Sequence, residues 1–256
     1  MEEKVYFKNS KGDKLCGVLS SVTGDKSKPM IILCHGFSSS KDSNTYILFE
    51  KRFNDKGFST FRFDFYGHGE SEGKFEDITV SEAVDDTISA IKFLKGREHI
   101  KFGLIGSSFG GMTALLTAAK SKHLSVLGLR APVSDYLKHL IARYTEVGIE
   151  DWKKTGFTYY VRAETGEKLR LNYSFFEDAS KIDGYKNAKK IMTPTIIVHG
   201  GNDFTVPIEQ SVKCCENIKD CKLHILPKAN HHFSNTEDYE KCINLIVDFF
   251  VEKLNQ

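Results

Sequence analysis

The stretch FGLIGSSFGGMTALL, residues 102–116, decides the fold of this chain. Residues 102–105 predict a buried strand, and the apolar run that follows predicts a helix over 109–120. Between them lies the pattern Gly-x-Ser-x-Gly, with Ser108 at its centre. At a sharp turn from strand to helix, small flanking residues permit a strained backbone that exposes the serine hydroxyl. The pattern therefore predicts that Ser108 is a nucleophile.

The same pattern occurs a second time around Ser71, in Gly69-Glu70-Ser71-Glu72-Gly73. No strand is expected directly before Ser71, and no apolar helix is expected after it. The two flanking glutamates would also oppose the negative charge of an alkoxide. We therefore do not expect Ser71 to be the nucleophile.

Strands and helices alternate on both sides of the Ser108 stretch. Residues 30–34 form a continuous apolar run, which is typical of a strand buried on both faces of a parallel sheet. Such alternation predicts a mainly parallel sheet of about eight strands, flanked by helices on both faces. We expect strands near 5–8, 14–21, 30–34, 58–65, 101–105, 124–129, 195–198 and 222–226, and helices near 46–56, 79–95, 109–120, 208–218 and 239–254.

The alternation lapses over residues 132–190. We interpret this segment as an insertion within a single domain that spans 1–256, not as a second domain. Two runs in it, 157–162 and 169–175, flank Thr165-Gly166-Glu167 and predict a hairpin.

The composition narrows the classes of function. Lys and Arg total 36 against 34 Asp and Glu, giving a net charge of +2, which argues against a nucleic-acid surface or a polybasic membrane surface. No stretch approaches the roughly 18 apolar residues of a membrane span. The first residues, MEEKVYF, do not resemble a secretory signal, so we expect a cytoplasmic protein.

Six cysteines occur in the chain, and none of them forms a Cys-x-x-Cys pair. In a cytoplasmic protein we expect all six to be reduced and mostly buried, and we expect no zinc site. Nothing in the sequence calls for another metal or a cofactor.

A nucleophilic serine needs a histidine base and an acid that orients it, in the chain order Ser, Asp or Glu, His. His231 and His232 both follow the strand expected at 222–226, and spacing alone does not separate them. Asp203 directly follows the strand at 195–198 and is the favoured acid. Asp135, after the strand at 124–129, is its rival.

Stabilisation of an oxyanion requires two backbone N–H donors. One comes from the residue after the nucleophile, which is Phe109. The other is expected from the loop after the strand at 30–34, where Phe37 follows Gly36. We expect His35, in the same loop, to brace it.

Several of these motifs occur together in the order of a known family. They resemble the α/β-hydrolase esterases, particularly the bacterial cinnamoyl and feruloyl esterase branch. The resemblance implies an α/β-hydrolase fold, His231 as the base, Asp203 as the acid and a bracing role for Ser71. The stretches that carry it are His35-Gly36-Phe37, Asp64-Phe65-Tyr66-Gly67-His68-Gly69-Glu70-Ser71, Gly106-Ser107-Ser108-Phe109-Gly110, His199-Gly200-Gly201-Asn202-Asp203-Phe204-Thr205-Val206-Pro207 and Ala229-Asn230-His231-His232-Phe233.

The insertion 132–190 corresponds to the lid of this family. It is rich in aromatic residues, which could wall an apolar or aromatic acyl site. Most of them are expected only to pack the lid onto the domain. The candidates for substrate contact are Asp135, Trp152, Tyr159 and Tyr160.

The resemblance implies a serine carboxylic-ester hydrolase that forms an acyl-enzyme on small to medium acyl or aryl esters. Hydroxycinnamoyl (feruloyl-type) esters are one candidate class of substrate. The alternatives with the same three residues are an acylglycerol lipase, an acyl thioesterase and a serine aminopeptidase. A non-catalytic binding protein of this fold is a further alternative. The expected partner is a small-molecule ester, and the features above are compatible with a homodimer.

Overall fold

The centre of the molecule is an eight-stranded sheet in the computed structural model, which describes residues 1–22, 25–162 and 165–255. In spatial order its strands are β1 (Glu2–Lys8), β2 (Lys14–Ser20), β4 (Ser59–Phe63), β3 (Met30–Cys34), β5 (Phe102–Ser107), β6 (Leu124–Arg130), β9 (Thr195–Gly200) and β10 (Cys221–Leu226). The six from β4 to β10 are parallel, and the hairpin β1–β2 joins β4 in antiparallel orientation. The expected mainly parallel sheet is confirmed.

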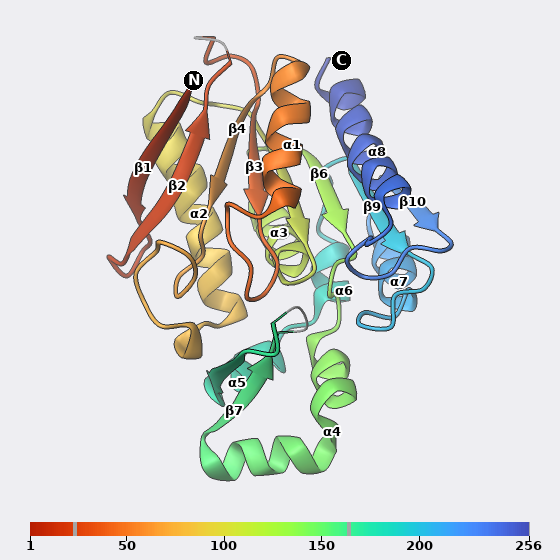
Figure 1. The fold of residues 1–256 in the computed structure, drawn as a ribbon. Coiled ribbons are helices and arrows are strands. Elements are labelled where there is room, and N and C mark those ends of the chain that lie inside the picture. The colour runs from red at the N-terminus through yellow and green to blue at the C-terminus, as the bar shows by residue number, and fades with distance from the viewer. Residues whose placement is uncertain (23–24, 163–164, 256) are drawn as a thin grey trace.

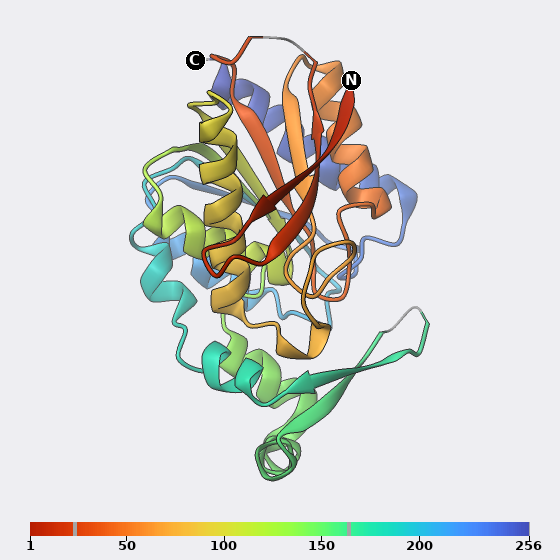
Figure 2. The same cartoon turned by 90° about the vertical axis from the view of Figure 1, so that its left-hand side faces the viewer.

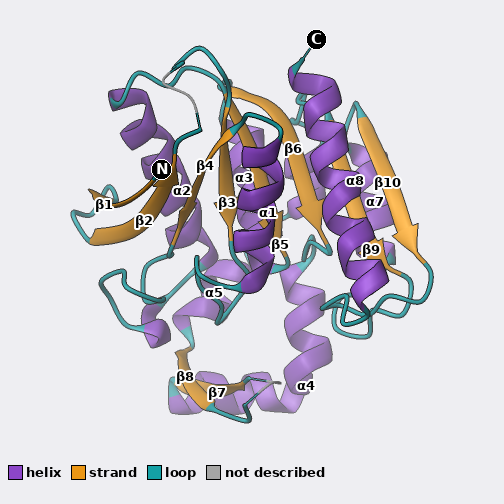
Figure 3. Ribbon diagram, turned by 45° about the horizontal axis from the view of Figure 1, so that its top comes forward, coloured by secondary structure: helices purple, strands orange, loops and turns teal. Residues whose placement is uncertain are grey.

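Helices cover both faces of this sheet (Figures 1 and 3). One face carries α1 (Asn44–Asp55) and α8 (Thr236–Leu254), which also contact each other. The other carries α2 (Val80–Gly96), α3 (Phe109–Lys120), α6 (Gly184–Ala188) and α7 (Glu209–Asn217). Every residue of β3, β4 and β5 is buried between these layers, which explains their continuous apolar character. A short 3₁₀ helix, η1 (Phe75–Asp77), precedes α2.

Residues 136–162 and 165–179 lie beyond the carboxyl ends of the parallel strands, below the sheet in Figure 1. They form α4 (Tyr136–Thr155), the expected hairpin of β7 (Phe157–Val161) and β8 (Lys168–Asn172), and α5 (Ser174–Ala179). The hairpin projects from the molecule as an arm in Figure 2. The sequence did not predict α4, whose helical pattern is interrupted where Thr145 adopts φ 61°. The last helix of the insertion, α6, packs on α3 and α7 and so joins the helical layer of the sheet.

The expectation that all six cysteines are reduced is wrong for one pair. Cys215 and Cys221 form a disulfide between the end of α7 and the start of β10. The turn between these elements brings the two Cα atoms to 5.5 Å, a separation that a disulfide spans without backbone movement. Cys16, Cys34, Cys214 and Cys242 are buried free thiols, as expected.

No helix in the described part of the chain combines the length and the apolar character needed to cross a membrane.

Candidate active site

Ser108 occupies the sharp turn between β5 and α3, with φ 52° and ψ −110°. Two glycines make this turn sterically accessible. A Cβ atom at Gly106 would collide with the carbonyl of Gly110, and a Cβ atom at Gly110 would collide with the carbonyls of Cys34 and His35. The backbone N–H of Ser108 donates to the carbonyl of Arg130 at 3.0 Å, which anchors the turn to β6. The turn thereby places the hydroxyl beyond the edge of the sheet.

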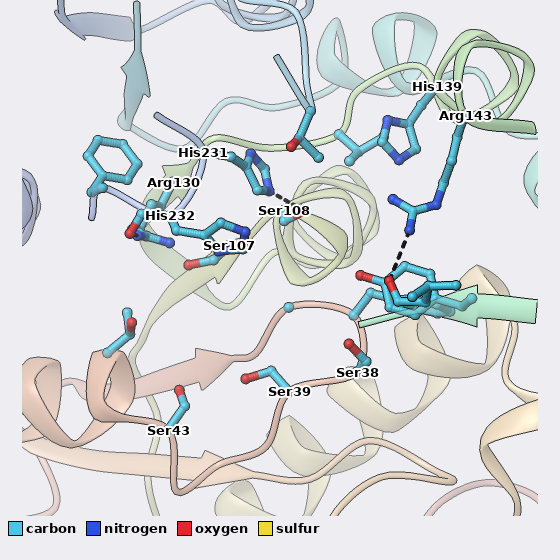
Figure 4. Close-up of a pocket in the computed structure, with 18 of the residues that line it drawn as sticks. Ser38, Ser39, Ser43, Ser107, Ser108, Arg130, His139, Arg143, His231 and His232 are labelled. Atoms are coloured by element: carbon cyan, nitrogen blue, oxygen red, sulfur yellow. Dashed lines mark hydrogen bonds between the residues drawn. The ribbon is translucent and has the colours of Figure 1, made fainter. Parts of the chain in front are cut away.

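A continuous chain of hydrogen bonds runs from Ser108 through His231 to Asp203. Figure 4 shows its first link, between Ser108 and His231. The Oγ of Ser108 lies 3.0 Å from Nε2 of His231, and Nδ1 of His231 lies 2.6 Å from Oδ2 of Asp203. His231 is in the loop after β10, and Asp203 is in the loop after β9. The carboxyl ends of neighbouring parallel strands thus bring together three residues that are far apart in the sequence.

Four donors surround the carboxylate of Asp203. Its Oδ1 accepts hydrogen bonds from the backbone N–H groups of Thr205 (2.9 Å) and Val206 (2.8 Å). Its Oδ2 faces His231 and also the Nε2 of His199 at 3.1 Å. Burial raises the pKa of Asp203, but the hydrogen bonds from His199 and His231 outweigh it and hold the pKa well below its usual range. The anionic group can therefore orient the imidazole and stabilise it when it is protonated.

Two backbone N–H groups are available beside Ser108. Phe109 is the first residue of α3, and Phe37 lies in the loop after β3. That loop lies close to the turn of Ser108. A Cβ atom added to Gly36 would lie only 3.9 Å from Cβ of Ser108. Within the described residues neither N–H has a hydrogen-bond acceptor. Both groups can therefore donate to an oxyanion formed next to Ser108.

The structure distinguishes the residues that the sequence left as alternatives. His232 is exposed, and its carbonyl accepts a hydrogen bond from Arg130. Asp135 caps α4 by accepting from the N–H of Lys138 at 3.1 Å. Neither side chain takes the place of His231 or Asp203 in the hydrogen-bonded chain from Ser108.

The expected bracing residues have the contacts that such a role requires. The hydroxyl of Ser71 donates to the carbonyl of Asp64 (2.6 Å) and accepts from the N–H of Cys16 (2.9 Å). The Nε2 of His35 accepts from the N–H of Phe65 at 3.1 Å. Both residues therefore tie separate loops together.

A cavity of about 610 Å³ opens around Ser108. On one side is what we call the α1 lobe, and on the other is what we call the insertion lobe. The α1 lobe is lined by Ser43, Asn44, Thr45, Tyr46, Arg130 and Tyr239. The insertion lobe is lined by Tyr136, His139, Leu140, Arg143, Tyr160 and Phe175. Figure 4 shows Ser108 between Arg130 on one side and Arg143 on the other.

Of the four candidates for substrate contact, the structure places Tyr160 in the cavity wall, where its ring packs on Phe37 at 4.9 Å. The other three do not line it. Trp152 is buried inside the insertion and donates to the carbonyl of Leu171, and Tyr159 is 50% exposed on the hairpin. Asp135 serves as the helix cap described above. Substrate contact therefore stays a prediction for Tyr160 alone.

Sequence reasoning missed the basic side chains of the cavity, Arg130, His139 and Arg143. Burial, with the charge of Arg143 nearby, lowers the pKa of His139 to about 4. Arg130 could have been noticed in the sequence, because it is a charged residue at the end of an apolar strand. The functional side chains gather at that edge of the sheet. The other two lie on α4, a helix that the sequence did not predict.

One acidic group in the described residues has the close spacing of metal ligands, and it consists of Glu82, Asp85 and Asp86. Its carboxylates already accept hydrogen bonds from Asn9 and from the backbone N–H groups of Ser10 and Tyr66. Lys11 pairs with Glu82. These contacts account for the group as a structural network.

Comparisons with known proteins agree with this architecture. A bovine mitochondrial palmitoyl-protein thioesterase, ABHD10, is 24% identical over 235 residues, covering 89% of this chain and 74% of the relative. The human serine hydrolase BPHL is 26% identical over 212 residues, covering 75% of this chain and 70% of the relative.

Solved structures share the fold along nearly the whole chain. Est1E from Butyrivibrio proteoclasticus with bound ferulic acid superposes with a TM-score of 0.82 at 24% identity, covering 98% of this chain and all of the other. The mouse α/β hydrolase domain-containing protein 10 gives 0.78 at 20% identity, covering 98% and 99%. The family model of the prolyl oligopeptidase family matches residues 40–256. The chain therefore belongs to the prolyl oligopeptidase family and is a serine hydrolase with the α/β-hydrolase fold.

Proposed function

We propose that this chain is a carboxylic-ester hydrolase that forms an acyl-enzyme on Ser108. The observation that carries the proposal is the hydrogen-bonded chain from Ser108 through His231 to Asp203, next to the two free N–H groups of Phe37 and Phe109. A non-catalytic binding protein would have no need for this complete set of groups.

In the first half-reaction, Oγ of Ser108 attacks the ester carbonyl carbon while Nε2 of His231 takes the hydroxyl proton. Asp203 stabilises the imidazolium, and the N–H groups of Phe37 and Phe109 donate to the negatively charged carbonyl oxygen. Collapse of the tetrahedral intermediate breaks the bond to the alcohol oxygen, which receives the proton from His231. In the second half-reaction a water molecule, deprotonated by His231, attacks the acyl carbon. The bond to Oγ of Ser108 then breaks, Oγ takes the proton back from His231, and the acid leaves.

The aromatic wall of the insertion lobe supports small to medium acyl or aryl esters as the substrate class. Tyr160 and Phe175 pack against Phe37 at ring distances of 4.9 and 5.2 Å. These faces can cover a planar acyl group, such as a hydroxycinnamoyl group. We propose that the insertion 132–190 is the lid of a single domain and that it sets the acyl preference.

An acyl thioesterase is the second candidate, because relatives that align with 89% of this chain are named palmitoyl-protein thioesterases. Thioester hydrolysis would use the same groups at Ser108, so only the leaving group separates the two proposals. A panel of para-nitrophenyl esters of increasing chain length, hydroxycinnamoyl methyl esters, acyl-CoA thioesters and aminoacyl anilides would rank ester, thioester and peptide-like substrates.

The assignment of the nucleophile has a direct test. Ser108→Ala should lower ester turnover by on the order of 10⁴–10⁶-fold and abolish labelling by a fluorophosphonate probe. Ser71→Ala is the matched control, since it removes the serine of the second Gly-x-Ser-x-Gly pattern and should leave labelling intact. Labelling that persists in Ser108→Ala would refute the proposed nucleophile.

Cytoplasmic residence and a homodimer also stay predictions of the sequence. Cell fractionation would test the first, and light scattering on the purified protein would test the second.

A further inference from the structure

Arg130 is a buried cation at the edge of the proposed reaction site. Arg130 is the last residue of β6 and is only 8% exposed. It lines the α1 lobe. The register of β5 and β6 pairs Arg130 with Ser107, the residue before the proposed nucleophile. Arg130 therefore starts next to the turn that carries Ser108, and both residues line the same cavity.

The contacts of Arg130 do not neutralise its charge. One Nη donates to the carbonyl of His232 at 2.7 Å, and the guanidinium lies 4.5 Å from the ring centroid of Phe233. Its Nε is buried, and no hydrogen-bond partner is found for it in the described part of the chain. No described Asp or Glu lies within 4.0 Å of the guanidinium. Buried charges in proteins are normally paired, so this arrangement is unusual in the absence of a ligand.

The titratable neighbours of Arg130 do not supply an anion either. Burial raises the pKa of the Cys242 thiol to about 11 and that of the Tyr46 hydroxyl to about 12. Both groups are therefore neutral near pH 7. The described residues that line the cavity include no Asp or Glu at all. The α1 lobe thus has a positive charge without a counter-ion.

The N-terminus of α1 adds to this positive potential. Its N-cap residue, Ser43, makes no side-chain capping hydrogen bond, and the first turn contains no acidic residue. Ser43, Asn44 and Thr45 all line the α1 lobe. The nearest acid in the sequence, Asp42, is paired with Lys41 and Arg62. A helix N-terminus with free donors favours an anionic group.

We propose that the α1 lobe binds an anionic group of the substrate, with Arg130 as its charge partner and the N-terminus of α1 as a second donor. The substrate would be an ester in which a carboxylate or a phosphate lies on the side of the scissile carbonyl that faces away from the insertion. This inference rests on the proposed esterase activity and adds to it the class of substrate. The exposed Arg143 does not fit the same role, since it lies over the rings of Tyr144 and Tyr160 in contact with solvent.

Two pairs of esters test the proposal, each consisting of a carboxylate and a neutral counterpart. Mono-para-nitrophenyl glutarate against para-nitrophenyl pentanoate places the charge on the acyl part. Para-acetoxybenzoate against para-acetoxybenzamide places it on the alcohol part. We expect the wild-type kcat/KM to favour the charged member of at least one pair by about tenfold or more.

The decisive measurement is the ratio of kcat/KM between the two members of a pair. Arg130→Gln should reduce this ratio by about tenfold or more, to near one, and Arg130→Lys should retain part of the preference. If Arg130 only held the loop of His231 through the carbonyl of His232, both members would lose rate equally and the ratio would not change. Arg143→Gln is the matched control, and its ratio should equal that of the wild type.

Inhibition of para-nitrophenyl acetate hydrolysis needs no variant and separates the two kinds of anion. Stronger inhibition by inorganic phosphate than by acetate would identify a phosphate-bearing ester, and the reverse would identify a carboxylate. The proposal fails if the wild type has no charge preference and neither anion inhibits, or if Arg143→Gln collapses the ratio while Arg130→Gln does not. These results differ from those expected if the esterase proposal itself is wrong. In that case the neutral esters would not be hydrolysed either, and a fluorophosphonate would not label Ser108.

Discussion

The carboxyl edge of the sheet and the insertion contribute to the same cavity by different physical means. At the edge, short loops place Ser108, Asp203 and His231, and hydrogen bonds of 2.6–3.0 Å join these three residues. In the insertion, Tyr160 lies on strand β7 of the projecting hairpin and is held by ring packing. The residues of the proposed reaction are therefore positioned by directional hydrogen bonds, whereas the residues proposed to set specificity are positioned by less directional ring packing. We expect substitutions in the two regions to differ in size and in kind.

The largest effect is expected for the acid at the sheet edge. Asp203→Asn keeps an oxygen that can accept from the N–H groups of Thr205 and Val206, but it removes the charge that orients and stabilises His231. In other enzymes of this type the loss of that charge costs roughly 10⁴-fold in kcat. We expect a decrease of that order for ester hydrolysis, with little change in the melting temperature.

Asp135→Asn is the control for this prediction, because Asp135 also follows a strand of the sheet but caps α4 at the base of the insertion. It should cost less than about tenfold and act mainly on KM. A reversal of the two effects would transfer the role of the acid to Asp135. Comparable losses in both variants would mean that Asp135 supports Asp203 or the insertion.

The same contrast explains what could be predicted from the sequence. Ser108, Asp203 and the Phe37 loop were found because strand, turn and helix signals lie within a few residues of each function. His231 and His232 could not be separated by spacing, since only the fold decides which ring reaches Ser108; the resemblance to the esterases favoured His231. The structure brings the ring of His231, and not that of His232, to Ser108.

The insertion was less predictable, because its elements depend on contacts between distant residues. The pattern of α4 is broken at Thr145, and the place of Trp152 is set by a hydrogen bond to Leu171 on β8. No local signal distinguishes Tyr159, which is exposed, from Tyr160, which lines the cavity. The disulfide of Cys215 and Cys221 was missed for a related reason: the expectation came from the presumed compartment and not from the turn that joins α7 to β10.

An intermediate effect is expected in the insertion lobe, and these two adjacent tyrosines provide a matched pair. Tyr160→Ala removes a ring from the cavity wall and should change the ratio of kcat/KM between aryl and alkyl esters by about tenfold. Tyr159→Ala removes the same number of atoms from the exposed face of the same hairpin and should leave that ratio unchanged. A panel of hydroxycinnamoyl and straight-chain esters measures both. Equal rankings in the wild type and Tyr160→Ala would place acyl specificity in the core of the domain.

The last effect is on stability in mild acid and not on turnover, and it again separates the two regions. His68 is buried beside the loop after β3, where its Nε2 accepts from the N–H of Ser38, and burial lowers its pKa to about 3. The unfolded chain binds a proton at this residue below about pH 6.5, whereas the folded protein does not until about pH 3. The residue therefore costs stability as the pH falls below 6.5, by about 2 kcal/mol at pH 5. His139 in the insertion has its pKa lowered to about 4, but the residue is partly exposed. Solvent should therefore reduce the loss of stability that His139 causes in acid.

The measurement is the change in the free energy of unfolding between pH 7 and pH 5, obtained from urea titrations. The change must be compared between variants, because burial raises the pKa of Asp86 to about 7 and its protonation favours the folded state over the same range. His68→Gln should lessen the loss of stability on acidification more than His139→Gln does, and His123→Gln, at an exposed site, should not alter it. Most carboxyl groups titrate below this window, so the differences report on the histidines. A larger effect from His139 than from His68 would show that the insertion, and not the sheet edge, limits the stability of the protein in acid.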